Sequence, residues 1–278
     1  MMIRFLFAFV CLMSLPCLAQ EQEATDTPAE KLKKMQAVEG RLPEDTVTSF
    51  ARRVVDSTEA PWRTIGRVNV GGRAHCSGAL VGQALVLTAA HCLYSKPAER
   101  MVVPAILHFV AGYSKGEYQA HSRVKAYYVP PKFDGGRGET IENQPFDWAL
   151  LELADPIGKT LGFIPLHENL RAQEKAKQKP PTLNSPIVLT AGYPGDRAHV
   201  LSLEENCRIL RPLFGGHVLI TDCVAIKGDS GGPILQKVAD GYVIVGVLTA
   251  ATKVGHKVAS MGTSALAFRD KLKERSGQ

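Results

Sequence analysis

The sequence predicts an all-β protein, because short β-like runs recur along most of the chain with glycine-rich turns between them. These runs form two sets, which a polar, charged stretch from Glu168 to Pro181 separates. Only near the C-terminus, over residues 264–273, do apolar residues at helical spacing predict a well-defined helix. Many short strands at regular spacing indicate a β-barrel or a β-sandwich.

The N-terminus has the composition of a secretory signal covering residues 1–19. Arg4 precedes an apolar stretch over residues 5–15, and Ala19 ends the segment with a small residue. The apolar stretch is too short to span a membrane stably, so we expect cleavage after Ala19 and no stable membrane anchor. The alternative is a lipid anchor on Cys17, which the proline before it disfavours.

The next segment, residues 20–53, is predicted to be a pro-segment or an N-terminal arm. It is rich in Glu, Gln, Thr, Lys and Ala and poor in large apolar residues as far as about residue 45. The mature N-terminus stays open among three cleavage sites, after Ala19, after Arg41 and after Arg53.

The folded domain is expected over residues 54–278, with its two halves joined near residues 168–185. Its runs are rich in Val, Ile, Leu and Thr and are separated by turn residues. The first set of strands is expected at residues 65–70, 77–81, 84–88, 106–110, 123–129 and 148–153. The second set is expected at residues 187–191, 218–221, 233–236 and 242–249.

Composition and charge argue against several classes of function. The chain is 45% hydrophobic and 22% charged, which is typical of a globular protein. Its formal charge of +6 is modest for 278 residues, and no basic stripe is interleaved with aromatics, so we expect no nucleic-acid partner. No cysteine or histidine spacing predicts zinc and no acidic loop predicts calcium, so no metal or other cofactor is expected.

Cysteine usage points to an oxidising compartment. Cleavage after Ala19 would leave four cysteines, which are Cys76, Cys92, Cys207 and Cys223. An even number in an exported chain predicts two disulfides and a secreted or periplasmic location. Four cysteines allow three pairings, and the residues alone do not choose among them.

Three motifs carry candidate chemistry, in this order along the chain: TAAHC around His91, DWALLEL starting at Asp147, and GDSGGP around Ser230. A histidine held beside a serine takes the hydroxyl proton as a general base and returns it to a leaving group. A carboxylate at the start of an apolar strand needs a partner, because burying an unpaired charge is costly, and we expect that partner to be the imidazole N–H of His91. Asp134, in a glycine-rich loop, and Asp155, in a turn, are weaker candidates.

On these motifs the chain resembles the chymotrypsin-like (trypsin-fold) serine proteases, in a bacterial branch similar to the glutamyl endopeptidases. The resemblance covers residues 54 to about 270 and implies a double six-stranded β-barrel with a C-terminal helix and the site between the barrels. It implies that Ser230 is the nucleophile, that His91 is the general base and acid, and that Asp147 holds the imidazole. The N–H groups of Gly228 and Ser230 would form the oxyanion hole.

The resemblance also implies two structural features around this site. It pairs Cys76 with Cys92, which leaves Cys207 with Cys223. It assigns Asp229 to an ion pair that organises the oxyanion hole, with an α-amino group freed by proteolytic activation as the partner. Cleavage after Arg41 or after Arg53 would supply that group.

Substrate choice is expected to depend, by the same resemblance, on a specificity pocket with Val224 at its floor and Thr249 and Ala251 on its wall. Trypsin itself has an acidic floor, so Val224 predicts a medium-sized apolar P1 residue rather than Arg or Lys. Thr249 is also expected to hydrogen-bond Asp147. The acid-specific branch has a histidine where this chain has Leu248. Positive charge at the pocket rim is expected from Lys253, His256 and Lys257.

The leading hypothesis is therefore a secreted or periplasmic, monomeric serine endopeptidase that acts on protein or peptide substrates, with inhibitor proteins as further partners. The alternative is a catalytically silent binding protein with a protease fold. Such a protein would be expected to lack a triad residue or the oxyanion-hole glycine, and this chain has all of them.

Overall fold

The computed structural model describes residues 52–167 and 186–276. The predicted signal over residues 1–19, the cleavage site after Arg41 and the predicted junction near residues 168–185 lie outside the described residues. Within them, no helix is long and apolar enough to cross a membrane.

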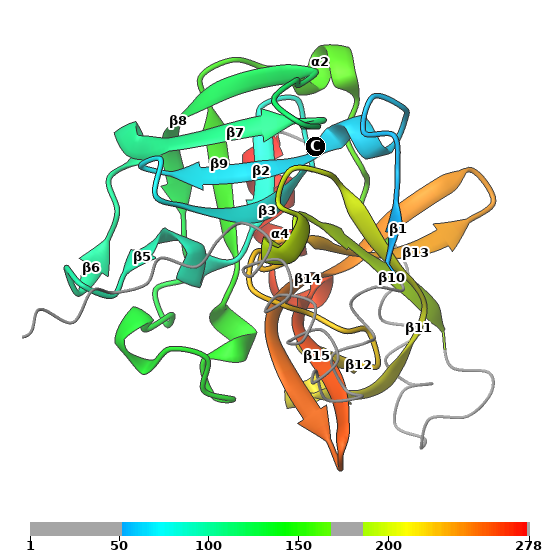
Figure 1. The fold of residues 1–278 in the computed structure, drawn as a ribbon. Helices are drawn as coiled ribbons and strands as arrows, with labels where there is room; N and C mark the ends of the chain where they lie inside the picture. The colour runs from blue at the N-terminus through cyan, green and yellow to red at the C-terminus, as the bar shows by residue number, and fades with distance from the viewer. Residues whose placement is uncertain (1–51, 168–185, 277–278) are drawn as a thin grey trace, which may run out of the picture. The chain divides into compact units, whose positions relative to one another are not determined.

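The first of two barrels is closed by six strands in the order β2-β3-β4-β9-β8-β7 (Figure 1). Its strands are β2 (Ile65–Val70), β3 (Ala74–Leu80), β4 (Leu85–Thr88), β7 (Leu107–Ala111), β8 (Ala120–Tyr128) and β9 (Ala149–Leu153). Gly71 and Gly72 make the turn between β2 and β3 with positive φ, a conformation that glycine adopts without strain. Buried side chains that include Val68, Leu80 and Phe109 form one apolar cluster of this barrel.

The second barrel also closes with six strands, in the order β11-β10-β13-β14-β15-β12, because β12 pairs back with β11. Its strands are β10 (Ile187–Gly192), β11 (Ser202–Leu213), β12 (Val218–Thr221), β13 (Pro233–Val238), β14 (Gly241–Val254) and β15 (Lys257–Ser264). A short strand, β1 (Arg53–Val54), adds to the outer side of β11. The two barrels confirm the predicted double six-stranded β-barrel.

The remaining elements are short. Strands β5 (Tyr94–Ser95) and β6 (Arg100–Met101) pair with each other, and α2 (Gly158–Leu161) is a single helical turn. The 3₁₀ turns are η2 (Trp62–Thr64), η3 (Ala90–Leu93), η4 (Pro104–Ile106), η5 (Gly135–Arg137), η6 (Gln144–Phe146), η7 (Gly195–Arg197), η8 (Phe214–Gly216) and η9 (Ala265–Ala267).

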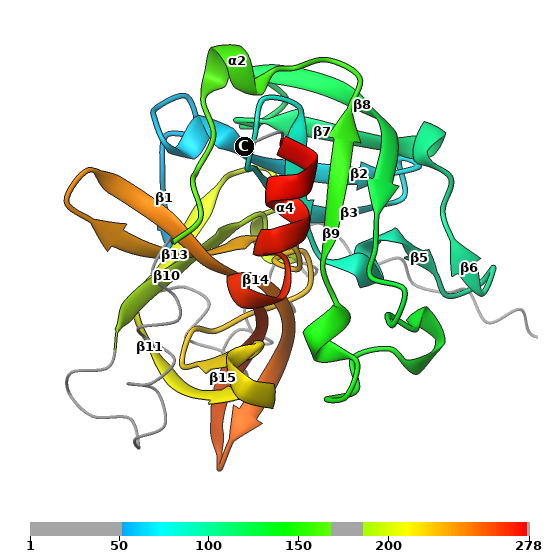
Figure 2. The same ribbon diagram turned by 180° about the vertical axis from the view of Figure 1, so that it is seen from behind.

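The C-terminal helix α4 covers Arg269–Ser276, so it starts five residues later than predicted. Ser264 still belongs to β15, and its side chain accepts a hydrogen bond from the Leu266 N–H, which caps the 3₁₀ turn η9 instead of an α-helix. Leu272 is buried, and the Phe268 ring just before the helix packs on Trp148, directly before β9, with ring centroids 5.7 Å apart. Figure 2 shows α4 beside β9. The helix is therefore attached to the first barrel.

Two long strands, β11 and β15, were not predicted from the sequence. Strand β11 mixes buried positions such as Leu203 and Ile209 with charged residues, and irregularities in its pairing with both neighbours break a clean period of two. Strand β15 is built largely from small or hydroxylated residues such as Ala259, Ser260 and Thr263, which are buried but carry little apolar signal.

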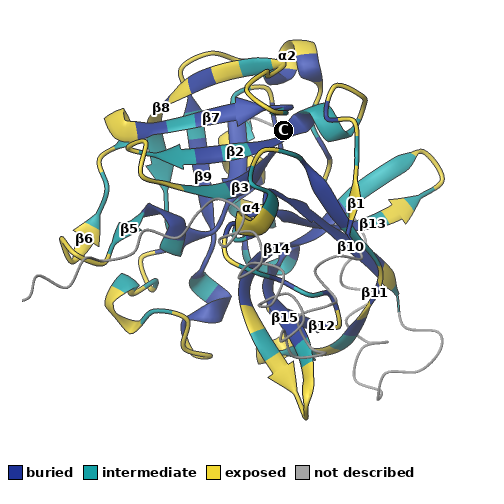
Figure 3. Cartoon of the chain, in the orientation of Figure 1, coloured by how far each residue is buried: buried dark blue, intermediate teal, exposed yellow. Residues whose placement is uncertain are grey.

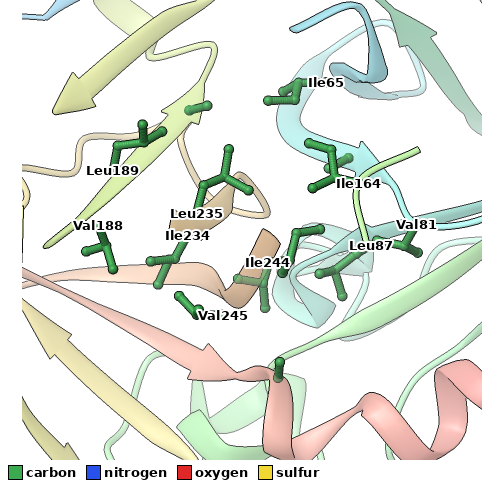
Figure 4. Packing of buried hydrophobic residues seen from close by; sticks show 14 of the residues in the cluster. Ile65, Val81, Leu87, Ile164, Val188, Leu189, Ile234, Leu235, Ile244 and Val245 are labelled. Carbon is green, nitrogen blue, oxygen red and sulfur yellow. The ribbon is translucent and has the colours of Figure 1, made fainter. Parts of the chain in front are cut away.

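An apolar cluster extends across both barrels (Figure 4). Ile65 and Leu87 from the first barrel belong to the same buried cluster as Ile234 and Ile244 from the second. Burying a side chain of this size stabilises the fold by about 1.5–3 kcal/mol, so the shared cluster holds the segments of the two barrels in contact. Figure 3 shows the buried residues along the strands, with exposed residues at the tip of the β14–β15 hairpin.

Candidate active site

The β4–β9 strand pair brings His91 and Asp147 together. Thr88 at the end of β4 pairs with Ala149 at the start of β9, so the turn after β4 lies beside the residues before β9. The His91 Nδ1 atom is 2.7 Å from Asp147 Oδ2, and the His91 backbone N–H donates to Asp147 Oδ1 at 2.9 Å. One histidine therefore holds both oxygens of the carboxylate.

This pairing raises the pKa of His91. Burial alone lowers the pKa, but the negative charge of Asp147 and its hydrogen bond to the ring outweigh burial and bring the pKa above its ordinary value of 6.5. Asp147 is only 1% exposed, so water does little to screen its charge. With Nδ1 donating to the carboxylate, Nε2 is the ring nitrogen that is free to accept a proton.

The two rival carboxylates have other roles. Asp134 Oδ1 accepts a hydrogen bond from the Gly136 N–H at 3.0 Å and caps the turn η5. Asp155 accepts a hydrogen bond from the Ser122 hydroxyl at 3.0 Å.

Ser230 lies on a turn of the second barrel that packs against the segment before His91. The Ser230 carbonyl accepts a hydrogen bond from the Ser77 N–H at 2.8 Å. A Cβ on the next residue, Gly231, would lie 2.1 Å from Thr88 Oγ1, so no larger residue fits between the two segments. The Cys92 sulfur is 3.8 Å from His91 Nε2 and 3.9 Å from the Ser230 carbonyl oxygen. These contacts bring the serine and histidine segments together.

Both disulfides implied by the resemblance are present. Cys76–Cys92 ties β3 to the turn that carries His91, and Cys207–Cys223 ties β11 to the loop before Ser230. Within the described ranges, Cys76, His91 and Cys92 form one group of three close potential metal ligands. Because both sulfurs belong to the disulfide, that group offers no thiolate to a metal.

Gly228 has the backbone geometry that the oxyanion-hole hypothesis needs. Its φ is +101°, and a Cβ there would lie 2.5 Å from the Tyr193 carbonyl oxygen, so only glycine fits without strain. The Gly228 carbonyl accepts a hydrogen bond from Ser77 Oγ at 2.9 Å, which fixes this peptide group. Among the described residues, neither the Gly228 N–H nor the Ser230 N–H has a protein acceptor. Both donors are thus available to an oxygen of a bound molecule.

Asp229 is paired with the side chain of Arg52 and not, in the intact chain, with an α-amino group. An Arg52 guanidinium nitrogen donates to Asp229 Oδ1 at 2.7 Å, and the Ile226 N–H donates to Oδ2 at 3.0 Å. Burial raises the pKa of Asp229, and the charge of Arg52 opposes that rise. The expectation of an α-amino partner overlooked Arg52, because a basic pair before Val54 resembles a cleavage site.

The residues predicted for the specificity pocket lie on the loop before Ser230 and on β14. Val224 is half-buried, Ala225 beside it is buried, and Ala251 on β14 is exposed and pairs with Ser260 of β15. Leu248 is buried, and its backbone exchanges hydrogen bonds with Gly231 and Gly232 of the serine turn. Lys253, His256 and Lys257 are exposed at the tip of the β14–β15 hairpin.

The predicted hydrogen bond from Thr249 to Asp147 is wrong. The Thr249 hydroxyl instead donates to Gln144 Oε1 at 2.5 Å, and the Met261 carbonyl lies 3.2 Å from the same hydroxyl. Gln144 is fully buried in η6, and its carbonyl accepts a hydrogen bond from the Asp147 N–H at 3.3 Å, so it contacts both residues that were expected to touch each other. Sequence reasoning missed Gln144, because a lone glutamine in a loop carries no motif.

Comparisons with known proteins show which family this chain is similar to. Residues 53–265 match the family model described as Trypsin. The chain is 26% identical over 194 residues to glutamyl endopeptidase of Bacillus licheniformis, covering 66% of this chain and 52% of that protein. It is 34% identical over 211 residues to serine protease 56 of Homo sapiens, covering 68% of this chain and 32% of that protein. The chain thus spans about a third to a half of the length of these relatives.

A solved structure of a Glu endopeptidase in complex with MPD has the same fold. It superposes on this chain with a TM-score of 0.64 at 21% identity, covering 82% of this chain and 97% of that one.

Proposed function

Because the chain belongs to the trypsin family, we propose that it is a serine endopeptidase that hydrolyses peptide bonds of protein or peptide substrates through an acyl-enzyme. The observation that supports this most directly is the double contact between His91 and Asp147, at 2.7 and 2.9 Å, beside the turn that carries Ser230. A histidine with its Nδ1 proton held by a buried carboxylate is suited to take a proton at Nε2.

The reaction assigns one role to each residue. His91 Nε2 takes the Ser230 hydroxyl proton as the oxygen attacks the scissile carbonyl carbon, and Asp147 stabilises the imidazolium that forms. The N–H groups of Gly228 and Ser230 donate to the carbonyl oxygen while it carries negative charge. His91 then gives the proton to the leaving amine, and a water molecule activated in the same way releases the acyl group and regenerates the serine.

Substrate preference is proposed for medium-sized apolar P1 side chains. Val224 supplies no counter-charge for Arg or Lys, and an unpaired guanidinium is costly to bury. The protein is also proposed to be exported, because two disulfides are typical of proteins that fold in an oxidising compartment.

Labelling with a fluorophosphonate probe tests this function. Wild-type protein should be labelled on Ser230 and should cleave casein, whereas Ser230→Ala should do neither. Ser114→Ala, in a turn where Ser114 forms a bridge with Glu117, is the matched control and should behave as wild type. Labelled Ser230→Ala protein would overturn the nucleophile assignment. A folded wild-type protein that refuses both probe and casein would favour the silent binding protein.

A further inference from the structure

We propose that Arg52 is a positioning residue that holds the oxyanion loop, residues 224–230, in its working conformation in the uncleaved chain. In this arrangement an internal guanidinium does what a newly freed α-amino group was expected to do. The proposal rests on the proposed endopeptidase function, and it predicts that proteolytic activation at Arg53 is not needed.

Arg52 is directed inward by its place on the chain. Arg53 and Val54 form β1 and pair with Leu203 and Ser202 of β11, so the backbone at this point is fixed. Successive side chains point to opposite sides along an extended chain. Accordingly, the Arg53 side chain is 55% exposed and pairs with Glu205 at the surface, whereas the Arg52 side chain is 1% exposed.

The Arg52 guanidinium joins the two ends of the oxyanion loop. One nitrogen donates to Asp229 Oδ1 at 2.7 Å, and another donates to the Val224 carbonyl at 2.8 Å. The Ile226 N–H donates to the other Asp229 oxygen, so the middle of the loop is tied to the same carboxylate. Because Arg is planar, permanently charged and rich in donors, it can satisfy this whole set at once.

A second carboxylate makes the surroundings of Arg52 more negative. The Arg52 Nε atom is 3.6 Å from Glu204 Oε2, an atom that has no hydrogen-bond partner among the residues in the two described ranges. Burial raises the pKa of Glu204, and Arg52 opposes that rise. A buried site with two carboxylates strongly favours a cation, and Arg52 is the cation that the chain supplies.

The conformation of the oxyanion loop determines where the Gly228 and Ser230 N–H groups point. Asp229 lies between Gly228 and Ser230, whose N–H groups are the proposed oxyanion hole. With the Asp229 side chain held inward by Arg52, the flanking peptide groups keep the orientation that leaves both N–H groups without a protein acceptor in the described structure. Loss of Arg52 would leave a buried carboxylate unpaired, and the loop would rearrange to relieve it.

Steady-state kinetics on the full chain test the role of Arg52. Arg52→Ala should lower kcat by about 100-fold or more, the usual effect of losing one oxyanion donor, with little change in KM. The neighbouring exposed residue gives the matched control, because Arg53→Ala should leave kcat within about twofold of wild type. Arg52→Lys should retain an intermediate kcat, and added guanidinium chloride at low concentration should partly restore Arg52→Ala. Equal kcat values for Arg52→Ala and wild type would overturn the proposal.

Preventing cleavage of the chain after Arg53, or forcing it, gives a second test of the proposal. Arg53→Gln protein, which mass spectrometry shows to be intact across residues 52–54, should be labelled by a fluorophosphonate as fast as wild type. A chain cut after Arg53 should lose activity as the segment with Arg52 dissociates. If activity instead appears only after that cut, the α-amino mechanism is correct and the proposal fails. Wild-type protein that is never labelled, cut or uncut, would count against the endopeptidase function itself, and the proposal would fail with it.

Discussion

The Thr249 hydroxyl donates to the side-chain oxygen of Gln144, so strand β14 of the second barrel directly contacts the turn that precedes Asp147. Thr263 of β15 adds a second link, because its hydroxyl donates to the Gln144 carbonyl at 2.6 Å. Gln144 is fully buried, and Asp147 follows it within one turn. The second barrel therefore positions the carboxylate that holds His91.

Removing the Thr249 hydroxyl should weaken both stability and activity. Thr249→Val leaves the buried Gln144 oxygen without a donor, which should lower the free energy of unfolding by about 1–3 kcal/mol. The turn that carries Asp147 also loses one of the hydrogen bonds that hold it in place. Because Asp147 would then hold His91 less firmly, kcat should fall as well. Urea unfolding and peptide kinetics measure the two effects. Thr252→Val, at a less buried position of the same strand, is the control, and equal losses in both variants would show that Gln144 plays no special part.

The pH profile should report the raised pKa of His91. Catalysis needs the neutral imidazole, so kcat/KM should fall as the pH drops through that pKa, and the midpoint of this acidic limb should lie above 6.5. Asp147→Asn removes the charge that raises the pKa, so the remaining activity should have its midpoint at lower pH, with kcat reduced by about 10⁴-fold. Asp155→Asn is the control. If the acidic limb of Asp147→Asn had the same midpoint as that of wild type, the claim that Asp147 raises the pKa of His91 would be contradicted.

Gly228→Ala should impair catalysis specifically. The new Cβ meets the Tyr193 carbonyl, and φ is +101°, so the loop must move and the aim of the Gly228 N–H is lost. We expect kcat to fall by about 10²–10³-fold, as for other oxyanion-donor losses. Gly255 also has positive φ, but a Cβ there meets open space at a hairpin tip. Gly255→Ala should therefore lower the stability slightly at most and leave kcat unchanged. A similar loss of kcat in both variants would show that the effect does not depend on the Gly228 N–H.

Substrate profiling should show apolar P1 preference. Leu, Phe or Val should exceed Arg by at least about tenfold in kcat/KM, a ratio for which about 1.4 kcal/mol suffices. A peptide library with randomised P1 measures this directly. A preference for Arg would mean that a carboxylate reaches the pocket from elsewhere. A preference for Glu would implicate the basic hairpin tip, and His256→Ala should then reduce it.

The parts of this protein that were predictable from the sequence are those with a local signature. Strands β2 and β12 have the predicted bounds. β12 consists entirely of β-branched and aliphatic residues, and β2 has such residues at three of its six positions and ends at a glycine turn. The motifs around His91 and Ser230 are equally local. By contrast, Arg52 and Asp229 are 177 positions apart, and no nearby residue marks them as partners. The same holds for Gln144 and Thr249, whose contact exists only after both barrels have closed.

The candidate active site is divided between the two barrels, and this has a consequence for the nascent chain. His91 and Asp147 belong to the half that leaves the ribosome first, whereas the serine lies 138 positions after Cys92. At about 5–20 residues per second, synthesis of that interval takes on the order of ten seconds. During this time the emerging polypeptide has the proposed base but not the proposed nucleophile. Even after Ser230 has been made, β13, β14 and β15 must still be added before the second barrel can close. On the proposed assignment, peptide-bond cleavage therefore has to wait until the second barrel has been made and closed.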